Sequence, residues 1–179
     1  YFEGFAPQTI TNNGTLTFSP NAYMEVNNGQ GVSLNSPLSI GGTISLSAGL
    51  LNTTATNILT IQSGGAASSG DFDSFINGPV IIETNSVSPF TVPVGRTNHH
   101  PVTIIPAAAT ASSYRVEALE NTIIDCATSN IEELVSNYYW DISRISGADA
   151  SIQLNYDAGL TSWTNGIPPD NSKFIFIIH

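Results

Sequence analysis

Short runs of alternating apolar and hydroxyl side chains dominate the first seventy residues. Four such runs cover residues 15–18, 31–34, 43–46 and 58–61. A period of two predicts β-strands that direct Leu and Ile inward and Thr and Ser outward. Asn-Gly, Gly-Gln-Gly, Ser-Pro and Gly-Gly breaks separate the runs, so the predicted strands are short.

The spacing of the inward positions limits how these strands connect. They recur at steps of 8, 8, 6, 6 and 6 residues, at Leu16, Met24, Val32, Leu38, Ile44 and Leu50. Such steps leave no room for crossover helices. They fit a β-meander or a β-solenoid of stacked rungs. The solenoid better explains the uncharged outward positions, because like residues then stack at about 4.8 Å, where repeated charges would repel.

The second part of the chain has a different strand pattern. Longer β-branched or aromatic runs cover residues 78–84, 90–94, 101–105, 114–119, 138–145, 151–156 and 173–178. Seven strands at this spacing, separated by Pro and Gly, predict an antiparallel β-sandwich. Before them, the Gly, Ala and Ser residues of 63–70 predict a flexible joint.

The expected fold is therefore all-β, with two units. A charge-poor solenoid-like or meander ladder is expected over residues 1–70, and a sandwich over residues 71–179. The only helix candidate is residues 130–137, because Ser129 or Asn130 can cap it and Glu132 and Glu133 suit its first turn.

The distribution of charge agrees with this division. Glu3 and Glu25 are the only charged residues among the first seventy, and the remainder holds twelve of the fourteen acids and all four basic residues. A net charge of −10 repels a phosphate backbone, which argues against nucleic acid as a partner. No apolar run approaches the roughly 20 residues that span a bilayer, so no membrane span is predicted.

Two features concern the surroundings of the chain. A single cysteine, Cys126, excludes an internal disulfide framework and predicts a small buried apolar side chain. The strand pattern of 173–178 has nothing polar after it to close it off. We therefore expect a piece of a longer protein, truncated at its C-terminus, whose open strand stack contacts other domains of that protein or neighbouring subunits.

Five sequence motifs, taken in order, resemble those of large surface proteins of Bacteroidetes. The family patterns are G-L-L-x-T-T followed by N-x-L-T-I, S-F-V-N-G-P-V, F-x-F-P-V-G-K, V-S-x-x-Y-W-x-I-x-R and x-L-x-Y-D. The matching segments are residues 49–61, 74–80, 90–96, 135–144 and 153–157. The chain departs from the family after Arg96, where residues 97–101 lack the usual aromatic and Arg before the Pro.

This resemblance implies a location and a modest role. Such proteins are typically exported by the type IX secretion system and generally have no assigned activity. We therefore expect a secreted or cell-surface location and a non-catalytic structural or adhesive module. The alternatives are a carbohydrate-binding module that uses Trp163 or Tyr139, and a fragment of a β-helix polysaccharide lyase or hydrolase.

Asp71 and Asp73 are the candidates for chemistry. At i and i+2 of a potential strand they would face together at roughly 7 Å. Asp after a Gly-rich stretch also caps turns, and the pair with backbone carbonyls would suit calcium as a cofactor. The sequence leaves the turn, the calcium site and the acid pair open.

The histidines and Trp140 are given structural roles. His99 and His100 are adjacent, so on a strand they point to opposite faces and do not readily chelate one ion. No Gly-x-Ser-x-Gly elbow accompanies them. Trp140 shares a predicted strand face with Tyr138 and Ile142, which is typical of a sandwich core.

Overall fold

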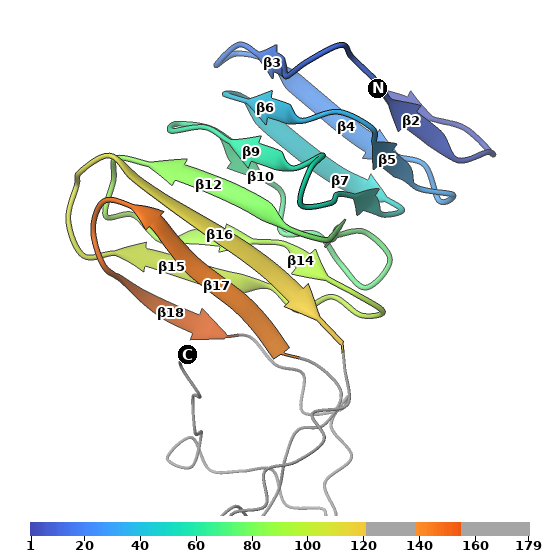
Figure 1. Ribbon diagram of the computed structural model, residues 1–179. Coiled ribbons are helices and arrows are strands. Elements are labelled where there is room, and N and C mark those ends of the chain that lie inside the picture. The colour runs from blue at the N-terminus through green and yellow to red at the C-terminus, as the bar shows by residue number, and fades with distance from the viewer. Residues whose placement is uncertain (121–138, 155–179) are drawn as a thin grey trace, which may run out of the picture.

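The computed structural model describes residues 1–120 and 139–154, and in these ranges the chain is all-β with no helix. The helix candidate at 130–137, Cys126, Trp163 and the strand pattern at 173–178 lie outside the described residues. Figure 1 shows a stack of short strands that leads from the N-terminus into a pair of facing sheets.

Three parallel sheets run along the stack. Sheet A contains β1 (Phe2–Glu3), β4 (Tyr23–Asn27), β7 (Thr43–Ala48) and β10 (Ala66–Ala67). Sheet B contains β2 (Gln8–Ile10), β5 (Val32–Leu34), β8 (Leu51–Asn52), β11 (Ile76–Asn77) and β14 (Val94–Gly95). Sheet C begins with β3 (Leu16–Phe18), β6 (Leu38–Ile40), β9 (Leu59–Ile61) and β12 (Val80–Thr84).

This is a solenoid and not a meander, because successive strands of the chain enter different sheets. In sheet C, Leu16, Leu38, Leu59 and Val80 lie in register on neighbouring parallel strands. Each rung thus places an aliphatic residue on the one before, and in the first three rungs a hydroxyl residue follows it and lies on the outer face. The predicted alternation is confirmed by the buried–half-buried–buried pattern of β5 and β9.

Sheet C itself continues from parallel into antiparallel pairing. β12 pairs in parallel with β9 on one side and antiparallel with β16 (Ser112–Leu119) on the other, and β16 pairs with β17 (Tyr139–Ser146). A fourth sheet, D, is entirely antiparallel. It contains β13 (Phe90–Val92), β15 (Val102–Pro106) and β18 (Ala150–Leu154).

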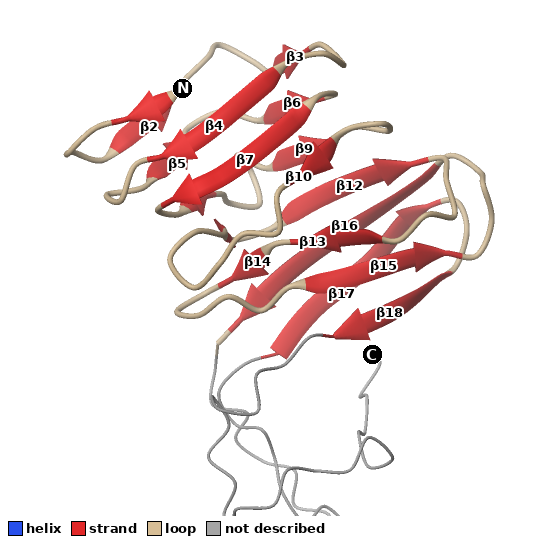
Figure 2. Ribbon diagram, turned by 180° about the vertical axis from the view of Figure 1, so that it is seen from behind, coloured by secondary structure: helices blue, strands red, loops and turns tan. Residues whose placement is uncertain are grey.

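Sheet D takes the place of sheet A in the lower part of the molecule. Seen from behind in Figure 2, β13, β15 and β18 follow β7 and β10 down the same side, with the lower strands of sheet C behind them. The predicted antiparallel sandwich is therefore built by sheet D and the end of sheet C. Its core is continuous with that of the ladder, since Ile61, Ile82 and Ile104 belong to one buried cluster.

The parallel ladder extends beyond residue 70, and the predicted flexible joint is wrong. β10, at Ala66–Ala67, pairs in parallel with β7, and the backbone N–H of Leu46 donates to the Ser68 hydroxyl at 2.8 Å. Space is limited at Gly65, where a Cβ would lie 3.1 Å from the Gly42 carbonyl oxygen. The Gly, Ala and Ser composition reflects a tight corner of the ladder.

Most predicted inward positions are buried, with two exceptions. Leu50 is only half-buried, and Leu51 occupies the inner position. The cause is Gly49, whose φ of +76° turns the chain from sheet A into sheet B and shifts the alternation by one residue. Leu16 is half-buried because β3 lies at the edge of sheet C, with a partner on one side only.

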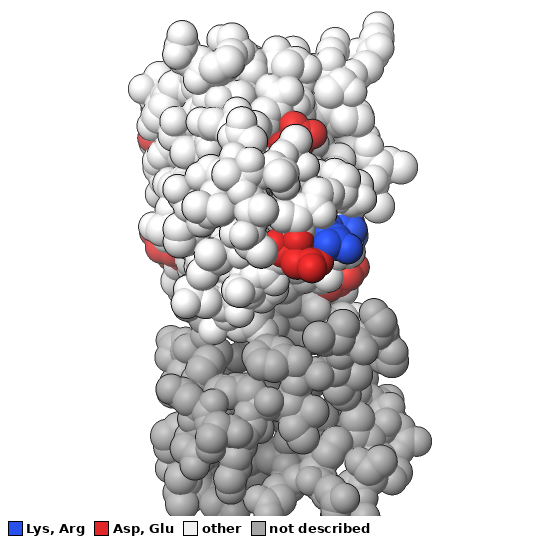
Figure 3. All heavy atoms as spheres, turned by 90° about the vertical axis from the view of Figure 1, so that its left-hand side faces the viewer, with Lys and Arg blue, Asp and Glu red and all other residues white. Residues whose placement is uncertain are grey.

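Charge is concentrated in the lower part of the molecule. On the face shown in Figure 3, the upper end carries few coloured atoms, and the blue atoms of Lys or Arg lie against red ones below it. All three ion pairs of the described residues involve β16, β17 or the turn after β17: Arg115 with Glu117 and Asp141, and Arg144 with Asp149.

Candidate functional site

The outward faces of the ladder carry rows of uncharged polar side chains. On sheet C, Thr17, Ser39 and Thr60 lie in register on three successive strands. The row then changes character, because Ile81 and Arg115 occupy the next two positions. The unbroken part of the hydroxyl row therefore lies on β3, β6 and β9.

An amide ladder runs along the outer face of sheet B. The Asn77 side-chain amide donates to Asn52 Oδ1 at 2.8 Å, and the Asn52 amide donates to the Ser33 hydroxyl at 3.4 Å. Arg96 continues the chain at its lower end, where Nη1 donates to Asn77 Oδ1 at 3.2 Å. All three bonds point the same way, and such chains polarise one another. The ladder thus ties three successive strands of sheet B, β5, β8 and β11, to the residue that follows β14.

Sheet A presents tyrosine rings beside a group of hydroxyls. The rings of Tyr1 and Tyr23 lie 6.1 Å apart, tilted by 55°. Two residues along β4, the Glu25 carboxylate accepts a hydrogen bond of 2.8 Å from Ser47, whose hydroxyl lies 3.3 Å from that of Ser45. This face combines exposed aromatic area with several free hydrogen-bonding positions.

The Asp71 carboxylate closes a tight turn. Its Oδ1 accepts hydrogen bonds from the Ser74 hydroxyl at 2.8 Å and from the Asp73 backbone N–H at 2.9 Å. These bonds, the Ser74 hydroxyl first, hold the pKa of Asp71 below its ordinary value. Because residues 71–74 form a turn, the strand geometry that would place Asp71 and Asp73 on one face is not present.

Asp73 contributes to the ladder through its backbone. Its carbonyl oxygen accepts from the Gly49 N–H at 3.1 Å, which joins the turn to the rung above. Within residues 1–120 and 139–154, no group of three or more His, Cys, Asp or Glu side chains is arranged to hold a metal ion. Calcium at Asp71 and Asp73 therefore stays a prediction.

A serine, a histidine and an aspartate do meet near this turn, but not as a nucleophilic site. Ser74 is fully buried and donates both to Asp71 and, at 3.2 Å, to the Leu46 carbonyl oxygen. The His99 ring stacks on Phe75, with centroids 6.1 Å apart. A hydroxyl that is buried and bonded to the carboxylate itself is not poised to attack a substrate.

The two histidines link the ladder to the sandwich. His99 packs on Phe75 of the ladder, whereas the His100 ring meets Trp140 edge-on, with centroids 6.1 Å apart. The Trp140 indole N–H donates to the His100 carbonyl oxygen at 3.0 Å. Burial lowers the pKa of both imidazoles. The two adjacent side chains thus make separate packing contacts. His99 packs on Phe75, next to β11, and His100 packs on Trp140 of β17.

Of the two predicted glycan residues, Tyr139 lies in the described part of the chain. Tyr139 begins β17 opposite Leu119 and is 36% exposed. Trp163 lies outside the described residues, so its distance from Tyr139 is not defined. Trp140, predicted to be core, is half-buried and packs against the main cluster together with Ile142.

The amide ladder and the tyrosine face were not predicted. Asn52 and Asn77 each follow an inward Leu or Ile, in Leu51-Asn52 and Ile76-Asn77, and that repeated pair is the signal that could have indicated stacking. Nothing comparable marks Tyr1 and Tyr23, which are distant in sequence and meet only through the pairing of β1 with β4.

Comparisons of this chain with protein-family models, with curated proteins and with solved structures found no match. Among the described residues, no helix has the length and apolarity needed to cross a membrane.

Proposed function

We propose that this chain is a non-catalytic structural or adhesive module on the outside of a bacterial cell, in which the parallel ladder is a stiff spacer. The observation that carries the proposal is the unbroken stack of sheet C, whose strands hydrogen-bond in sequence from β3 through β12 to β16 and β17. A solenoid gains stability from contacts between neighbouring rungs, so its length can grow without a larger core.

Hydrogen bonds at the corners between the sheets stiffen the ladder, in addition to the hydrogen bonds within each sheet. The Asn28 side chain, fully buried between sheets A and B, donates to the Ala6 carbonyl oxygen at 2.8 Å. Between sheets B and C, the buried Thr53 hydroxyl donates to the Pro79 carbonyl oxygen at 2.7 Å. These corner bonds add to the strand pairing within the sheets, and together they oppose bending.

The uncharged surface suits an exterior setting. Salt screens interactions between charges but acts little on hydroxyl and amide rows. Residues 1–70, all described, contain no ion pair and only two acids. The spacer would keep its structure as external ionic strength changes. The resemblance to exported surface proteins supports the same location.

The location is tested by labelling intact bacteria that produce the full-length protein with an epitope tag in the exposed 85–89 loop. Antibody is expected to bind before lysis, and proteinase K added to whole cells is expected to remove the signal while a cytoplasmic marker survives. Labelling that requires lysis would contradict the surface location. Cleavage of any polysaccharide by the purified protein would contradict the non-catalytic part.

A further inference from the structure

The outer face of sheet A has an unusual composition for this molecule. β4 directs Tyr23 and Glu25 outward, and β7 places Thr43 and Ser45 beside them in register. Below Thr43 the next position is Ala66. The Tyr23 ring thus lies at one end of a row whose next members, Thr43 and Ala66, are small. The small side chains leave a flat surface next to the ring.

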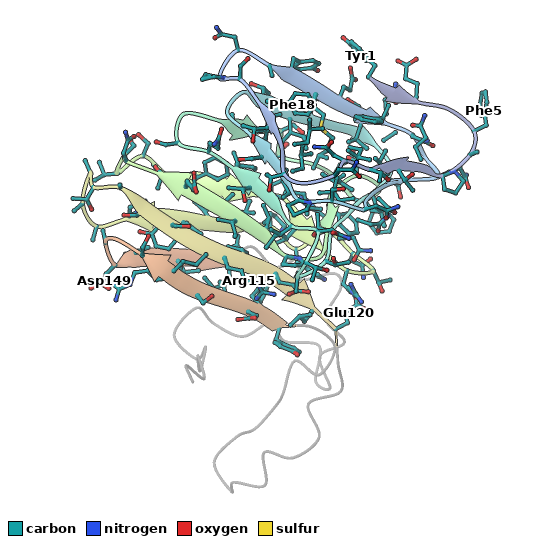
Figure 4. The ribbon with its side chains drawn as sticks, turned by 45° about the horizontal axis from the view of Figure 1, so that its top comes forward. Tyr1, Phe5, Phe18, Arg115, Glu120 and Asp149 are labelled. Atoms are coloured by element: carbon teal, nitrogen blue, oxygen red, sulfur yellow. The ribbon has the colours of Figure 1, made fainter. Side chains whose placement is uncertain are left out.

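The tyrosine rings on this face are exposed. Tyr23 is 54% and Tyr1 80% exposed, whereas Met24 and Val26, the aliphatic residues of β4, are buried. Figure 4 shows Tyr1 at the N-terminal end of the ladder. Exposed aromatic area of this kind is a common feature of ligand-contact surfaces, because a ring supplies apolar contact at low conformational cost.

Hydrogen-bonding groups lie beside the rings. Ser47 uses one acceptor position of the Glu25 carboxylate, which has about four. Ser45 and Ser47 add two hydroxyls, each able to donate and accept. Bonds to an ionised carboxylate are roughly twice as strong as those between neutral groups. The cluster can therefore bind a ligand that donates several hydroxyl groups.

The charges restrict the ligand further. Glu3 and Glu25 are the only charged residues in the first seventy, so nothing on this face compensates an anionic ligand. A cation alone would contact the rings and Glu25. It would make no favourable contact with the hydroxyl donors or with the flat surface at Thr43 and Ala66. A neutral sugar matches all of these groups, because its C–H face packs on a ring and its neighbouring hydroxyls donate to carboxylate and serine oxygens.

We propose that the outer face of sheet A binds a neutral polysaccharide, with the Tyr23 ring as the stacking platform and Glu25, Ser45 and Ser47 as hydrogen-bonding partners. This site differs from the pair Tyr139 and Trp163 predicted from the sequence. It goes beyond the spacer role and does not depend on where the protein is located.

Titration calorimetry of the full chain with hexasaccharides of β-1,4-linked glucose, mannose and N-acetylglucosamine tests the site. At least one probe is expected to bind. Tyr23→Ala is expected to weaken binding at least about tenfold, since it removes a central aromatic contact, whereas Tyr23→Phe keeps the ring and stays within about threefold of wild type.

Glu25→Gln and Phe72→Ala complete the design. Glu25→Gln keeps the size of the side chain and removes its charge, so a loss of about threefold or more is expected. Phe72, an aromatic that is 64% exposed and lies outside sheet A, provides the matched control, and Phe72→Ala is expected to bind like wild type. Urea unfolding of each variant separates loss of binding from loss of folding.

Three outcomes would overturn the proposal: none of the three probes binds, Tyr23→Ala binds like wild type, or tetramethylammonium or polygalacturonate binds in preference to the neutral probes. None of these outcomes bears on the labelling of intact cells, so the binding site and the spacer role fail separately.

Discussion

Residues 1–70 and the hairpin strands β16 and β17 differ in how outward side chains of neighbouring strands are matched. In the ladder, Thr17, Ser39 and Thr60 follow one another without any charge. In the hairpin, Arg115 contacts Glu117 and Asp141, both at 2.5 Å. The same sheet C therefore uses two kinds of surface, and the change occurs where parallel pairing ends.

Strand direction explains this difference. In a parallel solenoid every rung repeats the same path, so a charge at one position must be compensated in each neighbouring rung. Antiparallel strands bring together two different stretches of sequence, so opposite charges can be matched once, as in Glu117 and Asp141 around Arg115. Hydroxyl and amide rows are the simpler solution for a stack.

The strongest test of the comparison is whether the two regions unfold together. Ile61 in the ladder and Ile104 in the sandwich are both buried in one cluster. Ile61→Ala and Ile104→Ala are each expected to lower the free energy of unfolding by about 2–5 kcal/mol, through lost burial and a cavity. Urea titration followed by tryptophan fluorescence and circular dichroism should show one transition in both variants.

Ile81→Ala is the control, since that side chain points outward from β12, and it should cost less than either core variant. Two separate transitions, each sensitive to only one of the core substitutions, would mean that ladder and sandwich are independent units despite their shared sheet.

Gly49→Ala should damage the ladder corner specifically. A Cβ there would lie 1.8 Å from the Asn28 carbonyl oxygen, and φ is +76°. A loss of about 2–4 kcal/mol is expected from clash and backbone strain together. Gly64→Ala separates the two causes, because Gly64 has φ +88° but no atom within 4 Å of its Cβ position. If thermal unfolding shows the same loss of stability in both variants, the close contact between residue 49 and the Asn28 carbonyl oxygen does not contribute to the loss.

Acid should weaken the junction between the two regions. Burial lowers the pKa of His99 and His100, so the unfolded chain takes up protons first as pH falls below about 6.5, and stability declines from there toward the folded pKa values. Urea midpoints between pH 8 and 4.5 measure this slope, and the double variant His99→Gln, His100→Gln should flatten it. An unchanged slope would assign the effect to other groups.

Asp71 adds a second, more acidic decline. The Ser74 hydroxyl lowers its pKa, so the stability it contributes is present above about pH 4 and is lost as pH falls further. Asp71→Asn should remove the decline of stability below about pH 4 and leave the decline due to the histidines unchanged.

Asn52→Ala interrupts the amide ladder and is expected to lower the free energy of unfolding by about 0.5–1.5 kcal/mol, because Asn77 and Ser33 each lose a partner. Asn85→Ala in the exposed loop after β12 is the matched control and should change little. Equal effects in chemical denaturation would mean that the ladder bonds do not stabilise the stack.

The smallest effect is expected from Arg144→Gln, at less than about 1 kcal/mol, because its ion pair with Asp149 is exposed. This effect should shrink further in 1 M NaCl, whereas the effect of Asn52→Ala should not. If salt changes the effects of both variants equally, charge pairing does not distinguish the hairpin from the ladder.

Several elements of the fold could be predicted because their signals are local. Alternation of apolar and hydroxyl residues placed Val32, Leu38 and Ile44 inside and located β12 and the strands after it to within a few residues. Gly49 broke the prediction at Leu50, since one residue of positive φ reverses which side the following residues face. Ala66 and Ala67 have no strand signal, and only pairing with β7 makes them a strand.

The candidate sites were less predictable, because they join distant residues. Ser33 and Asn52 are 19 residues apart, and Asn52 and Asn77 are 25 apart, so no fixed period indicates the amide ladder. For Asp71 the local sequence indicated a turn as one of three possibilities. In the structure the carboxylate accepts hydrogen bonds within a turn.

The sequence by itself determined which face of most strands is buried, because that depends on a period of two within a few residues. Only the tertiary structure decided that the strands stack in parallel, that the stack passes residue 70, and which outward side chains meet. Those outcomes depend on the register between rungs, and register is set by loop lengths and corner geometry that differ from one rung to the next.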